Sequence, residues 1–173
     1  MRDQWNREID YLRISITDRC NLRCRYCMPE EGVTWFEHSQ ILTYEEIIRL
    51  CRIFYELGIR KVKVTGGEPL VRRDCMSFLA ELKKLRGVEQ VTLTTNGILL
   101  PDHLEALRTA GVDGINVSLD TLDDGLYSSL TGAPPGTAAL VWRAAEASAA
   151  MGIHTKLNAV LLPETVEGIV ELT

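Results

Sequence analysis

Three cysteines stand close together near the start of the chain, in the run Cys20-Asn-Leu-Arg-Cys24-Arg-Tyr-Cys27. Cysteine thiolates bind iron and zinc, and this spacing lets three sulfurs face one centre. Four cysteine ligands would occupy every iron of a 4Fe–4S cluster, whereas three leave one iron free for a small molecule. Catalytic metal centres keep such an open position, and structural ones close it. The spacing therefore predicts a catalytic iron–sulfur cluster.

A zinc site is the main alternative for these thiols. A structural zinc ion needs four ligands, and the nearest histidine in the sequence, His38, would give an unusual Cys3His spacing. The other two cysteines, Cys51 and Cys75, lie in amphipathic stretches, so we interpret them as core residues. Because five cysteines cannot all pair, we expect no disulfide framework.

The composition limits the class of protein and its partners. The chain has 173 residues, of which 46% are hydrophobic and 25% charged, as in one ordinary globular domain. Its apolar runs are too short to span a membrane, and its N-terminus lacks the apolar core of a signal peptide. We therefore expect a cytoplasmic protein with no membrane partner. A net charge of -5 disfavours nucleic acid but allows a local basic pocket for one small phosphorylated ligand.

Short alternating strands and capped amphipathic helices follow each other along the chain. The expected strands are residues 11–17, 61–65, 91–95, 114–120 and 154–162. Capping boxes are expected at Thr43 with Glu46 and at Asp102 with Glu105, single caps at Asp74 and Thr137, and a last helix over 165–172. Left-handed glycines are expected to end four helices, at Gly58, Gly87, Gly111 and Gly152. The pattern is a βα repeat.

The alternation of polar and apolar residues along the strands favours one kind of βα fold. Arg13 and Lys63 alternate with Leu12 and Val62, and the other strands likewise have one polar face. A doubly wound sheet would be apolar on both faces. We therefore expect an α/β fold that is a partial (β/α) barrel, with helices outside and a polar, ligand-binding concave face. A closed barrel takes ~250 residues, so five strands predict a truncated chain.

Two motifs resemble the radical S-adenosylmethionine (SAM) superfamily. C-x3-C-x2-C after a first strand is its cluster signature, and Tyr26 occupies the aromatic position before the last cysteine. The stretch Gly66-Gly67-Glu68-Pro69 matches its GGEP motif, which contacts the methionine amino group of the cofactor. The resemblance implies that residues 1–173 are the N-terminal portion of a radical SAM core, with a 4Fe–4S cluster and SAM as cofactors.

Within the superfamily, the sequence is similar to the GTP 3',8-cyclase family of molybdenum cofactor biosynthesis. The similarity rests on the order and spacing of LRIS at 12–15, TDRCNL at 17–22, TGGEPLVRR at 65–73, TTNG at 94–97 and NVSLDTL at 116–122. It implies cluster ligands Cys20, Cys24 and Cys27; SAM contacts Tyr26, Gly67 and Ser118; and GTP contacts Arg13, Lys63, Thr94 and Lys156. The GTP contacts and Ser118 all fall on the predicted polar face. Lys63 stands where this family often has arginine, so the charge is kept and planar bidentate contact is lost.

The implied reaction is that of a radical SAM lyase. Electrons from a donor cleave SAM to methionine and a 5'-deoxyadenosyl radical, which takes the ribose 3' hydrogen of GTP before the sugar closes onto C8 of guanine. The family carries a second three-cysteine cluster near its C-terminus, and no cysteine follows Cys75 here. We therefore expect these 173 residues alone to be inactive; whether the protein forms a homodimer is left open.

Two other functions stay open at this point. Another radical SAM enzyme, peptide-modifying or cofactor-maturing, would share the cluster but not the nucleotide, and Arg13 and Lys156 discriminate against it. A noncatalytic iron–sulfur or zinc domain would not cleave SAM.

Overall fold

The computed structural model describes residues 2–28, 32 and 34–172, and its centre is one parallel sheet. The strands are β1 (Tyr11–Ser15), β2 (Lys61–Thr65), β3 (Gln90–Thr95), β4 (Gly114–Ser118) and β5 (His154–Asn158). The helices are α1 (Tyr44–Glu56), α2 (Cys75–Lys83), α3 (Leu100–Ala110), α4 (Asp124–Thr131) and α5 (Thr137–Ala150). Short 3-10 segments cover η1 (His38–Gln40), η2 (Pro69–Val71) and η3 (Val166–Leu172).

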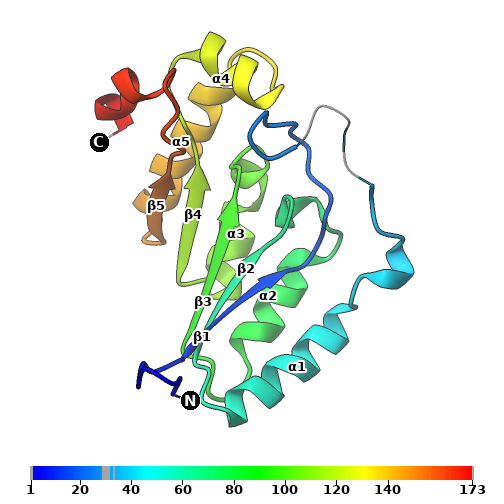
Figure 1. Cartoon of the computed structure of the whole chain (residues 1–173). Coiled ribbons are helices and arrows are strands. Elements are labelled where there is room, and N and C mark those ends of the chain that lie inside the picture. Colours follow the sequence, from blue (N-terminus) through cyan, green and yellow to red (C-terminus); the bar gives the residue numbers. More distant parts are fainter. Residues whose placement is uncertain (1, 29–31, 33, 173) are drawn as a thin grey trace.

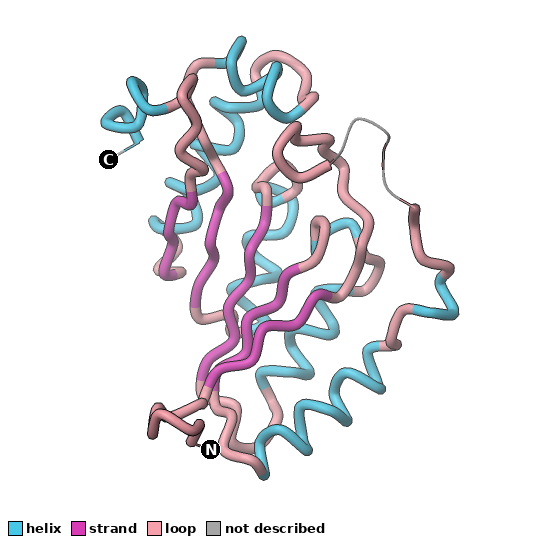
Figure 2. Tube along the Cα trace, viewed as in Figure 1, coloured by secondary structure: helices cyan, strands magenta, loops and turns pink. Residues whose placement is uncertain are grey.

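The strand order distinguishes a barrel-like sheet from a doubly wound one. The strands lie in the order β1-β2-β3-β4-β5, and every neighbouring pair is parallel. Right-handed crossovers that always move in one direction place their helices on one side of the sheet, whereas a doubly wound sheet reverses direction at a switch point. Figures 1 and 2 show α2, α3 and α5 behind the curved sheet, with its other face uncovered. The expected partial barrel is confirmed.

The apolar side chains of the central strands form the core beneath these helices. Val64, Leu93, Ile115 and Val117 have no solvent exposure, and the helices cover them with residues such as Leu79. Neighbours such as Lys63, Thr94 and Asn116 are only partly buried, because they face the open side. Within the described part of the chain, no helix has the length and apolar character needed to cross a membrane.

The ends of the helices test the expected capping residues. At α1 the box is confirmed: Thr43 Oγ1 accepts from Glu46 N at 3.2 Å, and Glu46 Oε2 accepts from Thr43 N at 2.7 Å. The box at Asp102 is wrong, because α3 begins at Leu100 and Asp102 lies in its first turn. Pro101 favours this earlier start, since proline lacks the N–H that a first helical turn leaves unpaired.

The two expected single caps also differ from the prediction. Asp74 occupies the N-cap position of α2, but it has a left-handed backbone with φ 60° and makes no side-chain capping bond. Thr137 is the first residue of α5, and Gly136 precedes it as N-cap. The glycine prediction is confirmed in conformation: Gly58, Gly87, Gly111 and Gly152 all have positive φ.

Three strands end earlier than expected, and one of them is β4, which ends at Ser118 instead of residue 120. β1 stops at Ser15 because the chain turns toward the GGEP motif, where Gly67 N donates to Thr17 O at 2.7 Å. β5 stops at Asn158, and the Asp120 carboxylate then replaces a backbone carbonyl by accepting from Val160 N at 2.8 Å. The expected helix over 165–172 is instead a 3-10 segment from Val166.

Candidate functional site

The three motif cysteines lie in the loop after β1, at the edge of the sheet where the parallel strands end. Cys20, Cys24 and Cys27 together line two neighbouring cavities, of about 410 Å3 and 350 Å3. Gly66 and Gly67 of the GGEP motif line both as well. The structure therefore brings the two sequence motifs to one place, as the βα topology predicts.

Helix α4, which the sequence reasoning missed, supports the cysteine loop. Arg23 N donates to Thr131 O at 2.9 Å, and Arg25 N donates to Leu130 O at 2.9 Å. The last carbonyls of a helix have no partner within the helix, so the loop satisfies two of them. Asp123 caps the start of α4 by accepting from Leu126 N at 2.7 Å, and Gly132 ends it with φ 72°. The sequence does contain the signal for this helix: Asp123 stands before it, Gly132 stands after it, and apolar residues recur at helical spacing between them.

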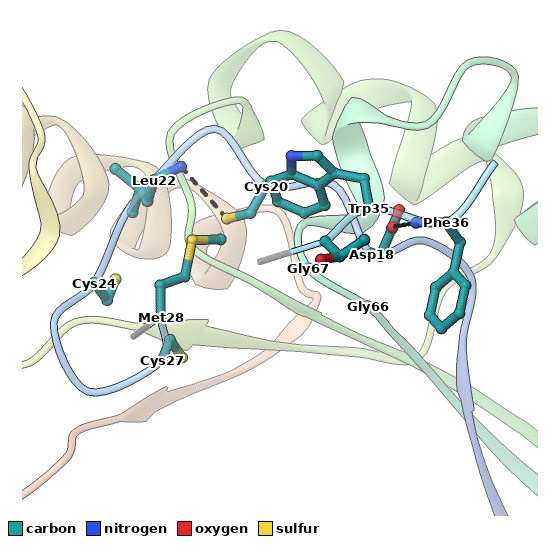
Figure 3. Close-up of a pocket in the computed structure, with 11 residues that line it drawn as sticks. Asp18, Cys20, Leu22, Cys24, Cys27, Met28, Trp35, Phe36, Gly66 and Gly67 are labelled. Carbon is teal, nitrogen blue, oxygen red and sulfur yellow. Dashed lines mark hydrogen bonds between the residues drawn. The ribbon is translucent and has the colours of Figure 1, made fainter. Parts of the chain in front are cut away.

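Aromatic side chains form one wall of the larger cavity. The guanidinium groups of Arg19 and Arg23 lie over the Trp35 ring, at 4.9 Å and 5.4 Å from its centroid. Phe36 N donates to Asp18 Oδ2 at 2.8 Å, which ties this segment to the residues just before Cys20. Figure 3 shows Trp35 and Phe36 beside Asp18 in this cavity. Such an apolar wall would limit the access of water to a bound cluster.

The GGEP turn packs directly on the backbone before Cys20. Glu68 N donates to Arg19 O at 2.8 Å. A Cβ atom on Gly66 would lie 2.7 Å from Thr17 O, and one on Gly67 would lie 2.6 Å from Arg19 C and collide with its carbonyl oxygen. Both glycines are therefore required by packing inside the protein. The expected contact of Gly67 with SAM remains a prediction.

Glu68 is the most deeply buried carboxylate of the site, with 1% exposure. Oε1 accepts from Leu70 N at 3.0 Å and from Thr95 Oγ1 at 2.8 Å, while Oε2 accepts from Asn96 N at 2.7 Å. Burial raises the pKa of Glu68, and these three hydrogen bonds oppose the shift. The side chain thus ties the GGEP turn to the end of β3.

Tyr26 lines the smaller cavity and makes a contact that sequence reasoning did not predict. Its hydroxyl donates to Oδ2 of Asp120, which has 3% exposure. Burial raises the pKa of Tyr26, and the neighbouring Asp120 carboxylate raises it further. Because Asp120 also binds Val160 N, it joins the cysteine loop to β4 and to the residues after β5.

Replacing Tyr26 by Phe should therefore lower the free energy of unfolding of the metal-free protein. The substitution leaves Asp120 Oδ2 buried without its donor, which costs about 1–3 kcal/mol. Urea unfolding, followed by circular dichroism, would measure it. Tyr11→Phe is the matched control, because Tyr11 is 44% exposed and Tyr26 39%, but only the Tyr26 hydroxyl makes a hydrogen bond within the described residues. Equal losses in the two variants would contradict the prediction.

The expected GTP contacts lie on the open face of the sheet. Arg13 pairs in register with Lys63, and Asn116 pairs with both Thr94 and Lys156. Burial lowers the pKa of Lys63, and the positive charges of Arg13 and Lys156 lower it further, so the three cations influence one another. Of the expected nucleotide and cofactor contacts, the smaller cavity brings five together: Arg13, Tyr26, Gly67, Thr94 and Ser118. Lys63 and Lys156 stand outside its lining.

The thiols fit an iron–sulfur cluster better than a single metal ion. Among the described residues, no three or more His, Cys, Asp or Glu side chains are grouped to hold one ion. A tetrahedral zinc site needs such convergence, whereas each cysteine of a 4Fe–4S cluster binds its own iron. Burial raises the pKa of the Cys24 thiol to about 11 and also raises that of Cys27. These thiols therefore release protons when they bind a metal.

A buried hydroxyl near the cysteines supports the same fit. Tyr127 is 1% exposed, and its hydroxyl has no hydrogen-bond partner within the described residues. Burial raises its pKa, and Cys24, Asp120 and Cys20 raise it further, which places it within electrostatic reach of the site. An unpaired buried donor costs free energy, and a cluster held by these cysteines would supply acceptor sulfurs that could offset this cost.

Comparison with known proteins gives the family. The model of the Radical SAM superfamily matches residues 14–173. The chain belongs to this superfamily. A 4Fe–4S cluster and SAM are its characteristic cofactors. Streptococcus suis SuiB with SAM bound has a TM-score of 0.76 and 26% identity, over 94% of this chain and 36% of that one.

Curated relatives narrow the similarity within the radical SAM superfamily. GTP 3',8-cyclase of Petrotoga mobilis is 54% identical over 76% of this chain and 41% of its own length. GTP 3',8-cyclase of Heliobacterium modesticaldum is 47% identical over 94% of this chain and 49% of its own length. The radical SAM chain described here thus spans about half the length of the curated relatives that it matches.

Proposed function

We propose that this chain is the N-terminal portion of the radical SAM core of a GTP 3',8-cyclase, which converts GTP to (8S)-3',8-cyclo-7,8-dihydroguanosine 5'-triphosphate in molybdenum cofactor biosynthesis. The observation that carries the proposal is the group of Arg13, Lys63 and Lys156 on the open face of the sheet, of which Arg13 lines a cavity with the three cysteines. No carboxylate of the described residues lies within ion-pair distance of these three. Lys63 is partly buried, whereas Arg13 and Lys156 are exposed on the same open face of the sheet. Three cations that face one another without a counter-ion favour an anionic ligand.

The spacing of these cations suits a polyphosphate. Arg13 and Lys63 are on adjacent strands, whereas Lys156 is three strands from Lys63. Neighbouring strands lie ~4.8 Å apart, so the two lysine backbones are ~14 Å apart across the sheet. Long lysine side chains can reach inward from both sides of such a gap. A triphosphate between them would offset the mutual repulsion that lowers the pKa of Lys63.

The remaining site residues receive roles that agree with their positions. Cys20, Cys24 and Cys27 would hold the cluster, and Tyr26, Gly67 and Ser118 would hold SAM against it. Thr94, which pairs in register with Asn116 and lines the smaller cavity with the three cysteines, would orient GTP. When bound, the cluster and SAM supply an electron and a 5'-deoxyadenosyl radical. The protein's own contribution is then to orient two nucleotides and to exclude water.

The partners and location follow from this assignment. An electron donor would reduce the cluster, and GTP would be the substrate. We also propose a cytoplasmic location without nucleic-acid or membrane partners, since all five cysteines are free thiols and suit a reducing compartment. The 173 residues are proposed to act as the N-terminal portion of a longer enzyme, with a homodimer as one possible assembly.

Peptide modification is the second candidate. Streptococcus suis SuiB has also been solved with its precursor peptide SuiA bound, at the same TM-score of 0.76. The cyclases are about twice as similar in sequence, and the group of three cations suits a nucleotide better than a peptide.

The decisive assay uses a chimera that joins this chain to the remaining half of a GTP 3',8-cyclase. A chimera would carry residues 1–173 in place of the matching half of the Heliobacterium modesticaldum relative, and product from GTP would be measured by chromatography after anaerobic reconstitution. We expect cyclisation by the chimera and none by the 173 residues alone. Lys156→Ala should lower kcat/KM for GTP by about 10- to 100-fold, because a charge-assisted hydrogen bond contributes about 1.5–3 kcal/mol.

Lys61→Ala is the matched control for that assay. Lys61 lies two residues before Lys63 on the same face, but it pairs with Asp10 at 2.7 Å at the far end of the strand. It should leave GTP turnover unchanged. An intact, reducible cluster that cleaves SAM but gives no product from GTP, or that acts on a peptide, would overturn the cyclase assignment.

A further inference from the structure

We propose that Asn96 is a positioning residue that donates an N–H···S hydrogen bond to Cys20 and thereby raises the reduction potential of the cluster. The inference rests on the cluster site proposed above. Asn96 directly follows β3 and lines the smaller cavity. Its Nδ2 lies 3.8 Å from Cys20 Sγ and 2.7 Å from Asn21 Oδ1. A second N–H, from Leu22, lies 3.4 Å from the same sulfur and is drawn as a dashed line in Figure 3.

The orientation of the Asn96 amide is fixed by its other contacts. Oδ1 accepts from Ile98 N at 3.1 Å, so the opposite end of the amide, the NH2 group, faces the cysteine loop. A flipped amide would place its oxygen against Asn21 Oδ1 and its NH2 group against the Ile98 N–H. The hydrogen-bond pattern therefore selects the orientation in which a donor faces Cys20.

Glu68 holds the backbone from which this side chain extends. Asn96 N donates to Glu68 Oε2 at 2.7 Å, and Thr95 Oγ1 donates to Oε1 of the same carboxylate. With 1% exposure, Glu68 has little freedom to move. The GGEP glutamate thus acts on the cysteine loop twice: through the turn that packs on Arg19, and through the end of β3 that presents Asn96.

A donor at this position changes the electronic properties of a bound cluster. Hydrogen bonds to ligating sulfurs withdraw negative charge from a cluster and favour its reduced form. Asn96 faces one of the three ligands, whereas Lys63 and Lys156 of the cation group stand outside the lining of this cavity. The residue therefore has a specific effect on potential that a purely structural residue would lack.

The test is a reduction potential measured without SAM or GTP. The whole 173-residue chain would be reconstituted anaerobically, and its electron paramagnetic resonance signal followed in a redox titration. Asn96→Ala should shift the potential to a more negative value. Asn96→Asp, which keeps the Ile98 contact but turns a charged acceptor toward Cys20, should shift it further in the same direction. Iron per chain should stay at the wild-type value in both variants.

Two controls separate the N–H···S contact from general effects. Asn21→Ala removes the other partner of the Asn96 amide and leaves the sulfur contact, so its shift should be much smaller. Asn158→Ala removes an amide from the same cavity wall and should not shift the potential. Unchanged potentials in both Asn96 variants, or an equal shift in Asn21→Ala, would overturn this inference and leave the cluster assignment intact. A wild-type chain that binds no cluster would overturn both.

Discussion

Alanine at Cys20, Cys24 or Cys27 should abolish the 4Fe–4S cluster, whereas alanine at Cys51 or Cys75 should leave it in place. Each motif cysteine is expected to bind one iron, and a cluster with two protein ligands is poorly held. Cys51 in α1 and Cys75 in α2 are each 3% exposed and pack in the core, away from both cavities. Anaerobic reconstitution, iron and sulfide analysis and absorption spectra would measure the outcome.

The core variants also control for damage to the fold. Removing a buried thiol group leaves a small void and costs on the order of 1 kcal/mol of unfolding free energy, so Cys51→Ala and Cys75→Ala should fold and bind iron normally. Burial in the core raises the pKa of Cys51 to about 11 and that of Cys75 to about 12, and neither thiol lines the cavities that the three motif cysteines share. Equal iron loss in all five variants would contradict the assignment of the ligands.

The parts of the fold that the sequence predicted are those governed by local periodicity. Val62 and Val64 are buried and Lys63 is not, because side chains of a strand alternate between faces whatever the surrounding topology. The same rule placed Arg13, Thr94 and Ser118 on the open face. The cysteine motif was equally local, since its three ligands fall within one loop.

The contacts that hold the site together could not be predicted from the sequence, because they join segments that lie far apart in it. Tyr26 meets Asp120 from 94 positions away, and Asn96 meets Cys20 from 76 positions away. Neither pair has a spacing that periodicity or capping rules address. Asp120 also explains why β5 ends before the expected residue 162. Its side-chain carboxylate accepts from Val160 N, where a backbone carbonyl of a neighbouring strand would otherwise accept. α4 is hard to predict for a different reason: it has only eight residues, so its apolar period is short and its main signals are the caps at Asp123 and Gly132.

Gly67→Ala should destabilise the protein and lower its iron content, even though the change adds a single methyl group. The added Cβ would lie 2.6 Å from Arg19 C, and the backbone of Arg19 cannot move without breaking the bond from Glu68 N or displacing Cys20 beside it. The φ of Gly67 is not positive, so the penalty comes from lack of space and not from backbone conformation. Overpacking of this kind typically costs 1–3 kcal/mol and can cost more. Urea unfolding of the metal-free protein and iron analysis after reconstitution would measure the two effects.

Gly125→Ala is the matched control for this overpacking. Gly125 lies in the first turn of α4, where a Cβ would meet only Asp123 Oδ1 at an ordinary 3.4 Å. Alanine should be neutral there or stabilise the helix by about 0.5–1 kcal/mol. The unfolding measurement also separates two roles of Gly67, because a residue needed only for approach to SAM would not affect the metal-free protein. If Gly67→Ala had wild-type stability and iron content but no longer bound SAM, packing on Arg19 would be irrelevant and cofactor approach would be the reason for the glycine.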